Sequence, residues 1–552
     1  MNRSIVIAAA TLGAGFVVAP RFATSVLVLA ASLVFIFAFP VANNIVKIKL
    51  EIRDFKRKSK GLPLIENASL INGHLVNFVL TRHVCDEITR QHKRLGKTFG
   101  FMFCAKRAVF STDLDLIKKL ILDEPNKNVN RPEIGWPIEE WNKTCIVQAE
   151  GKQWNRMRRA VAPALKSNHF KAPNVVHGIE VSINKLISAI ERKLEFVEET
   201  QKEKGNESER LPVAQVDIDD LMNRYSMDLV YSCFYKQDNL IDFEKEKDER
   251  VEIYGECGAK FNGNPFIILA ITFPFLRPII DWLSMHFHLH GKLRKEIRGF
   301  VETQAKQNLA ARKQLEQLKA SGKQHLVNSD NFTLKNGTQF KRNLMDYITD
   351  AFCEHKLNKR EYLHNAAFIH SAAYKTAADA LAGAIYFLST NKEIQEKTRE
   401  AIQAEGTEST YLSWVINETL RLCPPAPTGC SRINVEDIEL ADGRVIPANT
   451  SIHTPLYTIH RLPEYWGEDA EQFKPERFGD AKHFHPAQYM PFGAGVRACP
   501  GKEFALFEMK MVLCALLERY KFDGKEKPLK FDSPFLVFIV HDEPTYVRVT
   551  RL

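Results

Sequence analysis

The sequence predicts a mainly α-helical fold with a small β component, arranged as one large domain behind an N-terminal membrane anchor. Three observations support this: helical amphipathic periodicity recurs along the chain, strand-like runs are short, and the composition is that of a globular protein. Of the 552 residues, 45% are hydrophobic and 26% are charged, which is enough apolar material for a substantial core. The clearest helical windows are 151–164, 216–235, 360–390 and 410–422. The strand-like runs are 107–111, 433–440, 450–454 and 535–540.

Residues 1–48 differ in composition from the rest of the chain, and we expect them to anchor it in a membrane. A bilayer span takes about 20 apolar residues, and the run 23–46 is long enough, whereas a buried core helix is the less favoured alternative. The next segment, 47–60, is rich in lysine and arginine, and basic segments beside a membrane span stay on the cytoplasmic side. The sequence therefore predicts an uncleaved single-pass anchor over 1–48, a basic linker over 49–60 and a cytosolic domain over 61–552.

Four other stretches carry weaker signals. The apolar run 5–19 leaves a second membrane segment open, although Arg21 argues against one continuous helix. The run 264–276 is too short to span a bilayer, so it is either core, the favoured alternative, or a surface that dips into the membrane. The polar stretches 198–210 and 321–339 lack apolar periodicity and are expected to be surface loops.

The cysteine pattern and the net charge exclude several classes of protein. The ten cysteines include no CxxC pair and no cluster with zinc spacing, and they are too sparse for a disulfide scaffold. Mostly buried free thiols in a reducing compartment are therefore expected. The net charge of +9 is modest for this length and scattered, so nucleic acid is not the expected partner.

One cysteine has unusual neighbours, in the segment PFGAGVRACPG. Gly493 and Gly495 allow backbone conformations closed to other residues and leave no side chain to block a flat ligand. A helix is expected over 501–517, so Cys499 precedes a helix N-terminus, where a thiolate is favoured. A thiolate in a dry pocket needs a cation, which a haem iron supplies, and Arg497 is placed to pair with a porphyrin carboxylate. A buried inert cysteine in a glycine-rich turn is the alternative.

The same segment resembles the haem-binding loop of the cytochrome P450 superfamily, whose pattern is F-x-x-G-x-R-x-C-x-G. The fixed positions are filled by Phe492, Gly495, Arg497, Cys499 and Gly501. The resemblance implies the cytochrome P450 fold, with haem b held between a long distal helix and the cysteine loop. It also implies that Cys499 is the axial ligand of the haem iron and that Phe492 and Arg497 contact the cofactor.

The segments WVINETLRLCPP and FKPERF resemble the family's E-x-x-R helix and the arginine that joins it. Glu418 and Arg421 stand three apart on one helical face, where they can pair. The resemblance implies that Arg477 completes a buried structural triad with them. A solvated surface pair is the alternative.

The segment EGKQWNRMRRAVAP resembles the family's W-x-x-x-R helix. Trp154 and Arg158 are four apart on one face, and the resemblance implies that both reach a haem propionate. The alternative is a basic amphipathic helix, which is the simplest interpretation of Arg156 and Arg159.

The long distal helix should carry a motif like A-G-x-[DE]-T-T, and the match is AAYKTA at 372–377. Thr376 takes the position of the catalytic threonine, but Lys375 replaces the acid that helps to relay protons. Three functions remain open: a monooxygenase whose protons arrive by another route, an isomerase or dehydratase acting on peroxides, and a weakly active haem- or lipid-binding membrane protein. A charged lysine buried beside the haem would be costly, unless it turns away from the pocket.

A second departure is that residues 395–418 are fewer than the family usually has between these helices. Either the segment is naturally short or a piece of the coding sequence is missing, which would affect folding and haem binding.

The resemblance runs from about Leu95 to the C-terminus and is weakly closest to animal microsomal enzymes that oxidise drugs and steroids. It implies a monooxygenase that inserts one oxygen atom from O2 into a small hydrophobic substrate. The electrons would come from NADPH through a membrane-bound NADPH–cytochrome P450 reductase at the endoplasmic reticulum. Lys152, Lys502 and Lys510 are candidates for the basic face that such a partner would contact. No residue identifies the substrate.

Overall fold

The structure is a computed structural model of the whole chain. The residues that it describes are 41–69, 73–74, 83–132, 144–203, 211–235, 241–245, 248, 250–252, 272–273, 276, 278–279, 282–283, 289–321, 331–333, 339–525, 531–532, 540–541 and 544–552. The runs 5–19 and 535–539, and most of 23–46 and 264–276, lie outside these residues. Among the helices described, none is both long and apolar enough to cross a membrane.

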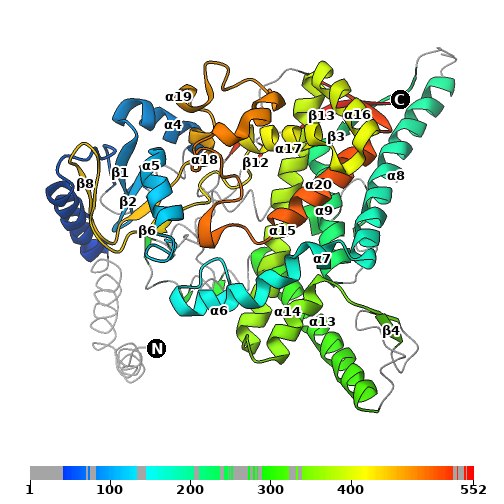
Figure 1. Cartoon of the computed structure of the whole chain (residues 1–552), viewed down its shortest axis with the longest axis horizontal. Helices are drawn as coiled ribbons and strands as arrows, with labels where there is room; N and C mark the ends of the chain where they lie inside the picture. Colours follow the sequence, from blue (N-terminus) through cyan, green and yellow to red (C-terminus); the bar gives the residue numbers. More distant parts are fainter. Residues whose placement is uncertain are drawn as a thin grey trace, which may run out of the picture.

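Helices dominate, as the sequence predicts (Figure 1). Within the described residues, the first helical segment covers residues 41–58. The longer α-helices that follow are α4 (Val84–Leu95), α6 (Gly151–Val161), α8 (Pro173–Glu203), α9 (Ile218–Tyr235), α13 (Leu289–Ala320), α14 (Leu344–Cys353), α15 (Lys359–Thr390), α16 (Lys392–Glu405), α17 (Thr410–Leu422) and α20 (Lys502–Leu517). Shorter helices are α5 (Leu114–Lys118), α7 (Ser167–Phe170), α18 (Leu456–Ile459) and α19 (Pro463–Trp466). Short stretches of other helix types are η1 (Lys119–Asp123), η3 (Ala162–Leu165), η7 (Gly406–Glu408), η8 (Pro475–His483) and η9 (Gly495–Arg497).

The β component is small and divided among several sheets. A four-stranded sheet has the order β1 (Thr98–Phe103), β2 (Lys106–Ser111), β9 (Ser451–His453) and β6 (Arg432–Ile433). A three-stranded sheet has the order β10 (Tyr520–Gly524), β13 (Tyr546–Arg551) and β3 (Val213–Asp217). The two-stranded pairs are β4 (Asn331–Thr333) with β5 (Gln339–Lys341), β7 (Ile438–Glu439) with β8 (Val445–Ile446), and β11 (Phe531–Asp532) with β12 (Val540–His541).

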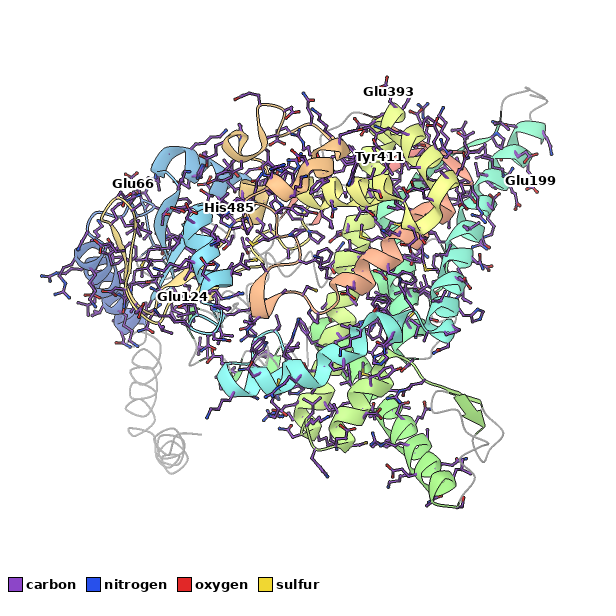
Figure 2. All side chains as sticks on the ribbon, viewed as in Figure 1. Glu66, Glu124, Glu199, Glu393, Tyr411 and His485 are labelled. Atoms are coloured by element: carbon purple, nitrogen blue, oxygen red, sulfur yellow. The ribbon has the colours of Figure 1, made fainter. Side chains whose placement is uncertain are left out.

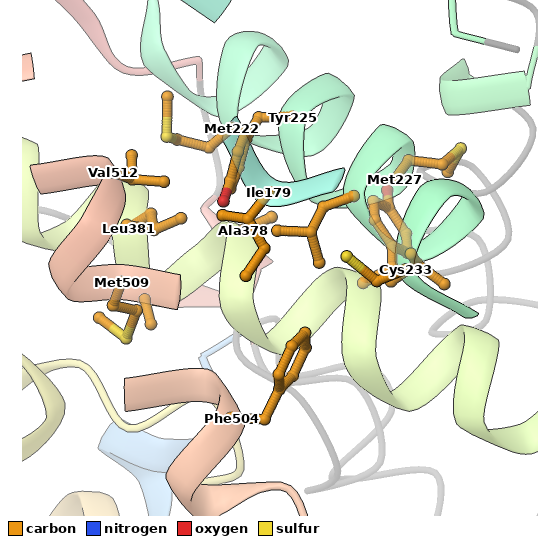
Figure 3. Close-up of a cluster of buried hydrophobic side chains, with 14 of the residues drawn as sticks. Ile179, Met222, Tyr225, Met227, Cys233, Ala378, Leu381, Phe504, Met509 and Val512 are labelled. Atoms are coloured by element: carbon orange, nitrogen blue, oxygen red, sulfur yellow. The ribbon is translucent and has the colours of Figure 1, made fainter. Parts of the chain in front are cut away.

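Helix α15 runs through the middle of the molecule, with α9 and α20 packed against it (Figure 1). Its first turn is fixed by a capping box, in which Asn358 and Glu361 exchange hydrogen bonds of 2.9 and 3.0 Å. Figure 3 shows the buried cluster between these helices, including Tyr225 of α9, Leu381 of α15 and Val512 of α20. Burying a side chain of this size stabilises the fold by about 1.5–3 kcal/mol. Polar side chains such as the labelled Glu393 lie at the periphery in Figure 2.

The predicted helical windows are confirmed as α6 with η3, α9, α15 and α17, and the helix after the cysteine segment is α20. Three expectations need correction. The run 433–440 is not one strand but the separate strands β6 and β7. Residues 198–203 are not a loop, because α8 continues to Glu203, where Lys202 and Glu198 pair at 3.1 Å one turn apart. The stretch 321–339 contains β4 and the first residue of β5, whose backbones pair as a short hairpin.

The short connection between α16 and α17 is closed by good capping geometry. Only η7 and Ser409 separate the two helices. The Ser409 side chain accepts a hydrogen bond from the Leu412 N–H, and Glu405 accepts one from the Thr410 N–H at 3.1 Å. Because the orphan N–H groups of α17 are satisfied in this way, the short segment is compatible with a complete helical junction.

Candidate active site

A cavity of about 560 Å³ lies between the four-stranded sheet, the cysteine segment and helices α6, α15 and α20. Apolar side chains make up most of its surface. From the predicted set, the cavity is lined by Trp154, Arg158, Thr376, Phe492, Arg497 and Cys499. The structure therefore gathers six candidate site residues from segments that are up to 345 positions apart around one apolar chamber.

Cys499 is held at the cavity by the backbone of its own segment. Its N–H donates to the Phe492 carbonyl at 2.8 Å, and α20 begins three residues later. The thiol is exposed to the cavity rather than to the outer surface of the molecule. The other cysteines in the described residues are free thiols that are buried or partly buried, as expected.

The glycines of this segment have the backbone conformations that the sequence predicts, and Gly495 has a packing role in addition. Gly493 and Gly495 have φ of +69° and +65°, a region that favours glycine. A Cβ atom on Gly495 would lie 2.1 Å from the Ile121 carbonyl oxygen, so this glycine permits a close backbone approach rather than keeping space for a flat ligand. A Cβ atom on Gly493 would lie 3.5 Å from the Cys430 sulfur.

Replacing Gly495 with alanine is expected to destabilise the protein by about 1–3 kcal/mol, because the methyl group would overlap the Ile121 backbone in a loop held at positive φ. Denaturant unfolding measures this loss of stability. Gly501→Ala is the matched control, since its Cβ would have no neighbour closer than 3.9 Å. Equal stability of the two variants would contradict the packing role.

Arg497 is the most constrained of the predicted contacts. Its guanidinium donates to the carbonyls of Val129, Ile146 and Ala149 at 3.0, 3.2 and 2.6 Å. It also stacks on the Trp154 ring, with 4.1 Å between the guanidinium carbon and the ring centroid. These contacts tie the cysteine segment to α6 and to the loop before it.

Two more arginines, which the sequence motifs did not reveal, surround the same region. Arg131 lines the cavity and donates to the Arg497 carbonyl at 3.1 Å, while its Nε atom is buried without a hydrogen-bond partner. Arg432 of β6 is buried beside the cavity wall. No motif signal marks either residue, because each becomes part of the site only through the packing of distant segments.

With Arg158 of α6, which also lines the cavity, these arginines make four and concentrate positive charge in one region. Burial, with mutual repulsion in addition, lowers the pKa of Arg497 to about 9 and the pKa of Arg432 to about 10. Burial also lowers the pKa of Arg131 and of Arg158. Buried cations are costly unless anions accompany them. The arginine cluster and the orphaned Nε of Arg131 therefore fit a ligand that carries carboxylates, such as the two propionates of haem.

The Cys499 thiol also fits a cationic ligand. Burial raises the pKa of Cys499, although the Gly501 N–H and the Arg158 guanidinium act in the opposite direction. A metal cation in the cavity would favour the thiolate, as expected for an iron ligand.

The residues Glu418, Arg421 and Arg477 lie in contact with one another, although they do not line the cavity. Arg421 donates two parallel hydrogen bonds to Glu418, at 2.7 and 2.8 Å, and both side chains are completely buried. Arg477 donates to Glu418 at 3.2 Å. Arg421 also donates to the carbonyls of His460 and Ala470, each at 2.6 Å, so it joins α17 to the segment that precedes the cysteine loop.

Helices α6 and α15 are joined by an ion pair in which only the carboxylate is buried. Arg156 binds the nearly buried Glu361 with both ends of its guanidinium and donates to the Lys356 carbonyl at 2.7 Å. Arg156 is therefore more than part of a basic helix face, because it fixes α6 against the first turn of α15.

On α15, Thr376 lines the cavity, and its hydroxyl donates to the Ala372 carbonyl at 2.8 Å. Lys375 does not line the cavity but pairs at 2.5 Å with the buried Asp379, one helical turn later. Burial disfavours the ammonium form, yet the Asp379 carboxylate outweighs it and raises the pKa of Lys375 above its usual value. The lysine in the acid position is thus turned from the cavity and neutralised by a carboxylate.

Replacing Lys375 with methionine is expected to destabilise the protein by about 3–5 kcal/mol, because Asp379 would be left buried without its cation. The double variant Lys375→Met/Asp379→Leu should recover most of this loss, and thermal unfolding of the two proteins measures the difference. If the double variant is as unstable as the single one, the pair is not the reason for the loss.

Glu508 of α20 is buried and lines the cavity. Burial raises the pKa of Glu508 from 4.5 to about 8. Between these two pH values the folded state keeps a proton that the unfolded state has lost, so this group makes the free energy of unfolding fall by about 1.4 kcal/mol per pH unit as pH rises.

Glu508→Gln removes this titration, so the variant should gain stability relative to the parent protein between pH 5 and pH 8. Denaturant unfolding at both pH values measures the gain. Glu503→Gln, at an exposed position of the same helix, is the control and should show no such change. A constant difference between Glu508→Gln and the parent would show that Glu508 titrates normally.

A cysteine thiol at a glycine loop, a cluster of buried arginines and a long helix across one apolar cavity define the site of a haem–thiolate protein. The comparisons with known proteins agree. The family model for cytochrome P450 matches residues 63–549, so the chain belongs to the cytochrome P450 family. It is accordingly a haem-dependent monooxygenase, an oxidoreductase.

The chain is similar to several members of the 3A series. It is 27% identical to cytochrome P450 3A13 of Mus musculus over 482 residues, which cover 82% of this chain and 86% of the mouse protein. It is 28% identical to cytochrome P450 3A7 of Homo sapiens over 476 residues, 83% of this chain and 85% of the human protein. The identity to cytochrome P450 3A29 of Sus scrofa is 28% over 460 residues, 79% of this chain and 80% of the pig protein.

Proposed function

We propose that this cytochrome P450 inserts one oxygen atom from O2 into a small hydrophobic substrate, with electrons that reach it from NADPH through a membrane-bound reductase. The observation that carries the proposal is the placement of Cys499 and Thr376 on one mostly apolar cavity. Such a cavity favours an apolar substrate, because burial of apolar surface supplies the binding free energy.

The residues of the cavity have distinct tasks in this proposal. Cys499 ligates the haem iron, and Trp154, Arg158 and Arg497, with Arg131, hold the propionates. Haem, when bound, supplies the oxygen-activating chemistry. The Thr376 hydroxyl lies on the cavity wall, where it can hold a proton at Oγ1 and release its hydrogen bond to the Ala372 carbonyl.

An isomerase or dehydratase that acts on peroxides is the second candidate, because such a reaction needs neither a proton relay nor a reductase. The position of Lys375 favours it, since the structure directs this side chain to Asp379 and leaves no acid at the usual place. A weakly active haem- or lipid-binding membrane protein is the third candidate and shares the same motifs.

The decisive measurement is the absorption spectrum of the purified protein, reduced and bound to carbon monoxide. A thiolate-ligated haem gives the band after which the family is named, and a protein without that band cannot be a haem–thiolate monooxygenase. With the band present, product formation that depends on NADPH and reductase supports the first candidate. Turnover of a lipid hydroperoxide without either supports the second, and neither activity supports the third.

We propose that the protein is anchored by residues 1–48 in the endoplasmic reticulum membrane, with a basic linker at 49–60 and a cytosolic catalytic domain at 61–552. The helix over 41–58 supports this, since Val46 and Leu50 are exposed apolar residues on it. Extraction of isolated membranes tests the proposal: the protein should stay in the membrane fraction after a carbonate wash and should be released by detergent.

The reductase is proposed to contact a basic face that includes Lys152, Lys502 and Lys510. Lys152 on α6 and Lys502 on α20 are exposed, and Lys510 is partly exposed on α20. Reversing these charges to glutamate should weaken reductase binding and its dependence on ionic strength, while the carbon monoxide spectrum stays unchanged.

A further inference from the structure

The four-stranded sheet places the imidazole of His453 on the wall of the cavity. Successive side chains of a strand point to opposite faces. In β9, Ser451 and His453 line the cavity, whereas Ile452 pairs in register with Arg432 of β6 and packs into the core cluster behind the sheet. Arg432 is thus on the far face of the sheet from His453.

The imidazole of His453 is held in place on three sides. Its Nδ1 lies 3.0 Å from the Ser431 hydroxyl, and its ring centroid lies 5.6 Å from the rings of Phe101 and Phe110. No other residue in the described part of the chain forms a hydrogen bond with this ring. Since Ser431 takes Nδ1, Nε2 is the nitrogen left for a molecule in the cavity.

This imidazole is suited to a neutral group rather than to an anion. Burial lowers the pKa of His453 to about 4, so the ring is uncharged at neutral pH. In a neutral imidazole one nitrogen donates and the other accepts, and a hydroxyl group can satisfy Nε2 in either tautomer. Around it the sheet contributes the apolar side chains of Phe101, Phe103, Ala108 and Ile433 to the cavity wall, and Lys106 and Ser451 are its other polar residues there.

We infer that His453 determines substrate specificity by binding a neutral oxygen, a hydroxyl above all, at one end of an otherwise apolar substrate. The apolar remainder then extends along the cavity toward α15, where Thr376 lies. The inference rests on the proposed function, because it assumes that the cavity holds substrate beside the haem. It adds the substrate class: elongated apolar molecules with one terminal hydroxyl or carbonyl.

The test compares three probes of equal chain length by equilibrium dialysis against the haem-loaded full-length protein in detergent. The probes are 1-decanol, 1-chlorodecane and decanoate, which carry a neutral hydroxyl, an apolar end and a carboxylate. One hydrogen bond to the substrate should make 1-decanol bind about tenfold more tightly than 1-chlorodecane. The comparison is made at pH 6, where the buried side chains of His453 and Glu508 are both uncharged.

His453→Phe should remove the preference, because it weakens the binding of 1-decanol and leaves the affinity for 1-chlorodecane unchanged. His92→Phe, on α4 and outside the cavity, is the control and should keep the preference. Equal binding of 1-decanol and 1-chlorodecane to the parent protein would overturn the inference, as would tightest binding of decanoate. The inference would also be overturned if His453→Phe lost haem but kept the preference, because His453 would then be a haem-binding residue. Absence of the carbon monoxide band from the parent protein would instead overturn the proposed function.

Discussion

Replacing Cys499 with alanine is expected to abolish the thiolate-type carbon monoxide band and to reduce turnover to the background of free haem. The reason is that the iron would lose the ligand that donates electron density to it. Since the arginine cluster remains, some haem should still bind, with a spectrum of another ligation state. Absorption spectroscopy and haem content measured on the same sample distinguish loss of the ligand from loss of the cofactor.

Cys353→Ala is the matched control for this experiment, because Cys353 is a partly exposed free cysteine on α14 that does not line the cavity. It should keep the band at full intensity. A Cys499→Ala protein with an unchanged band would mean that another residue ligates the iron, and the assignment of the site would be wrong.

Arg421→Ala is expected to be the most destabilising single substitution outside the cysteine loop. It leaves Glu418 buried without its cation, and removal of one partner of a buried ion pair costs about 3–5 kcal/mol. It also removes the hydrogen bonds to the carbonyls of His460 and Ala470. We expect a large fall in the apparent Tm and poor haem retention, both measured on freshly purified protein.

Arg94→Ala provides the comparison, since Arg94 forms an exposed pair with Glu66, and such pairs contribute about 0–1 kcal/mol. The apparent Tm of this variant should stay close to that of the parent. If Arg421→Ala and Arg94→Ala melt at the same temperature, the buried pair carries none of the stability assigned to it.

The sequence predicted the helices and the cysteine loop because both are encoded locally. The windows that became α6, α9, α15 and α17 have a strong helical period, and the segment around Cys499 has a distinctive spacing of glycines and arginine. Glu418 and Arg421 could be paired for the same reason, since they are one turn apart on a helix.

The parts that the sequence did not predict depend on contacts between distant segments. Arg131 and Arg432 belong to no helical pattern and become site residues only because their segments meet beside the cavity. Lys375 and Asp379 are an exception, because they are one helical turn apart and their pairing is local; the family motif at 372–377 does not include Asp379. His453 lies in a strand of three residues, too short for its alternation to be read without the neighbouring strands.

The contact between Arg156 and Glu361 has a consequence for how the molecule opens. Glu361 also forms the capping box that begins α15, so one carboxylate serves both the start of that helix and its attachment to α6. Unwinding the first turn of α15 therefore releases α6, and release of α6 weakens the first turn. In native-state hydrogen exchange, the backbone amides of these two segments should exchange as one cooperative unit, with closely similar free energies of opening.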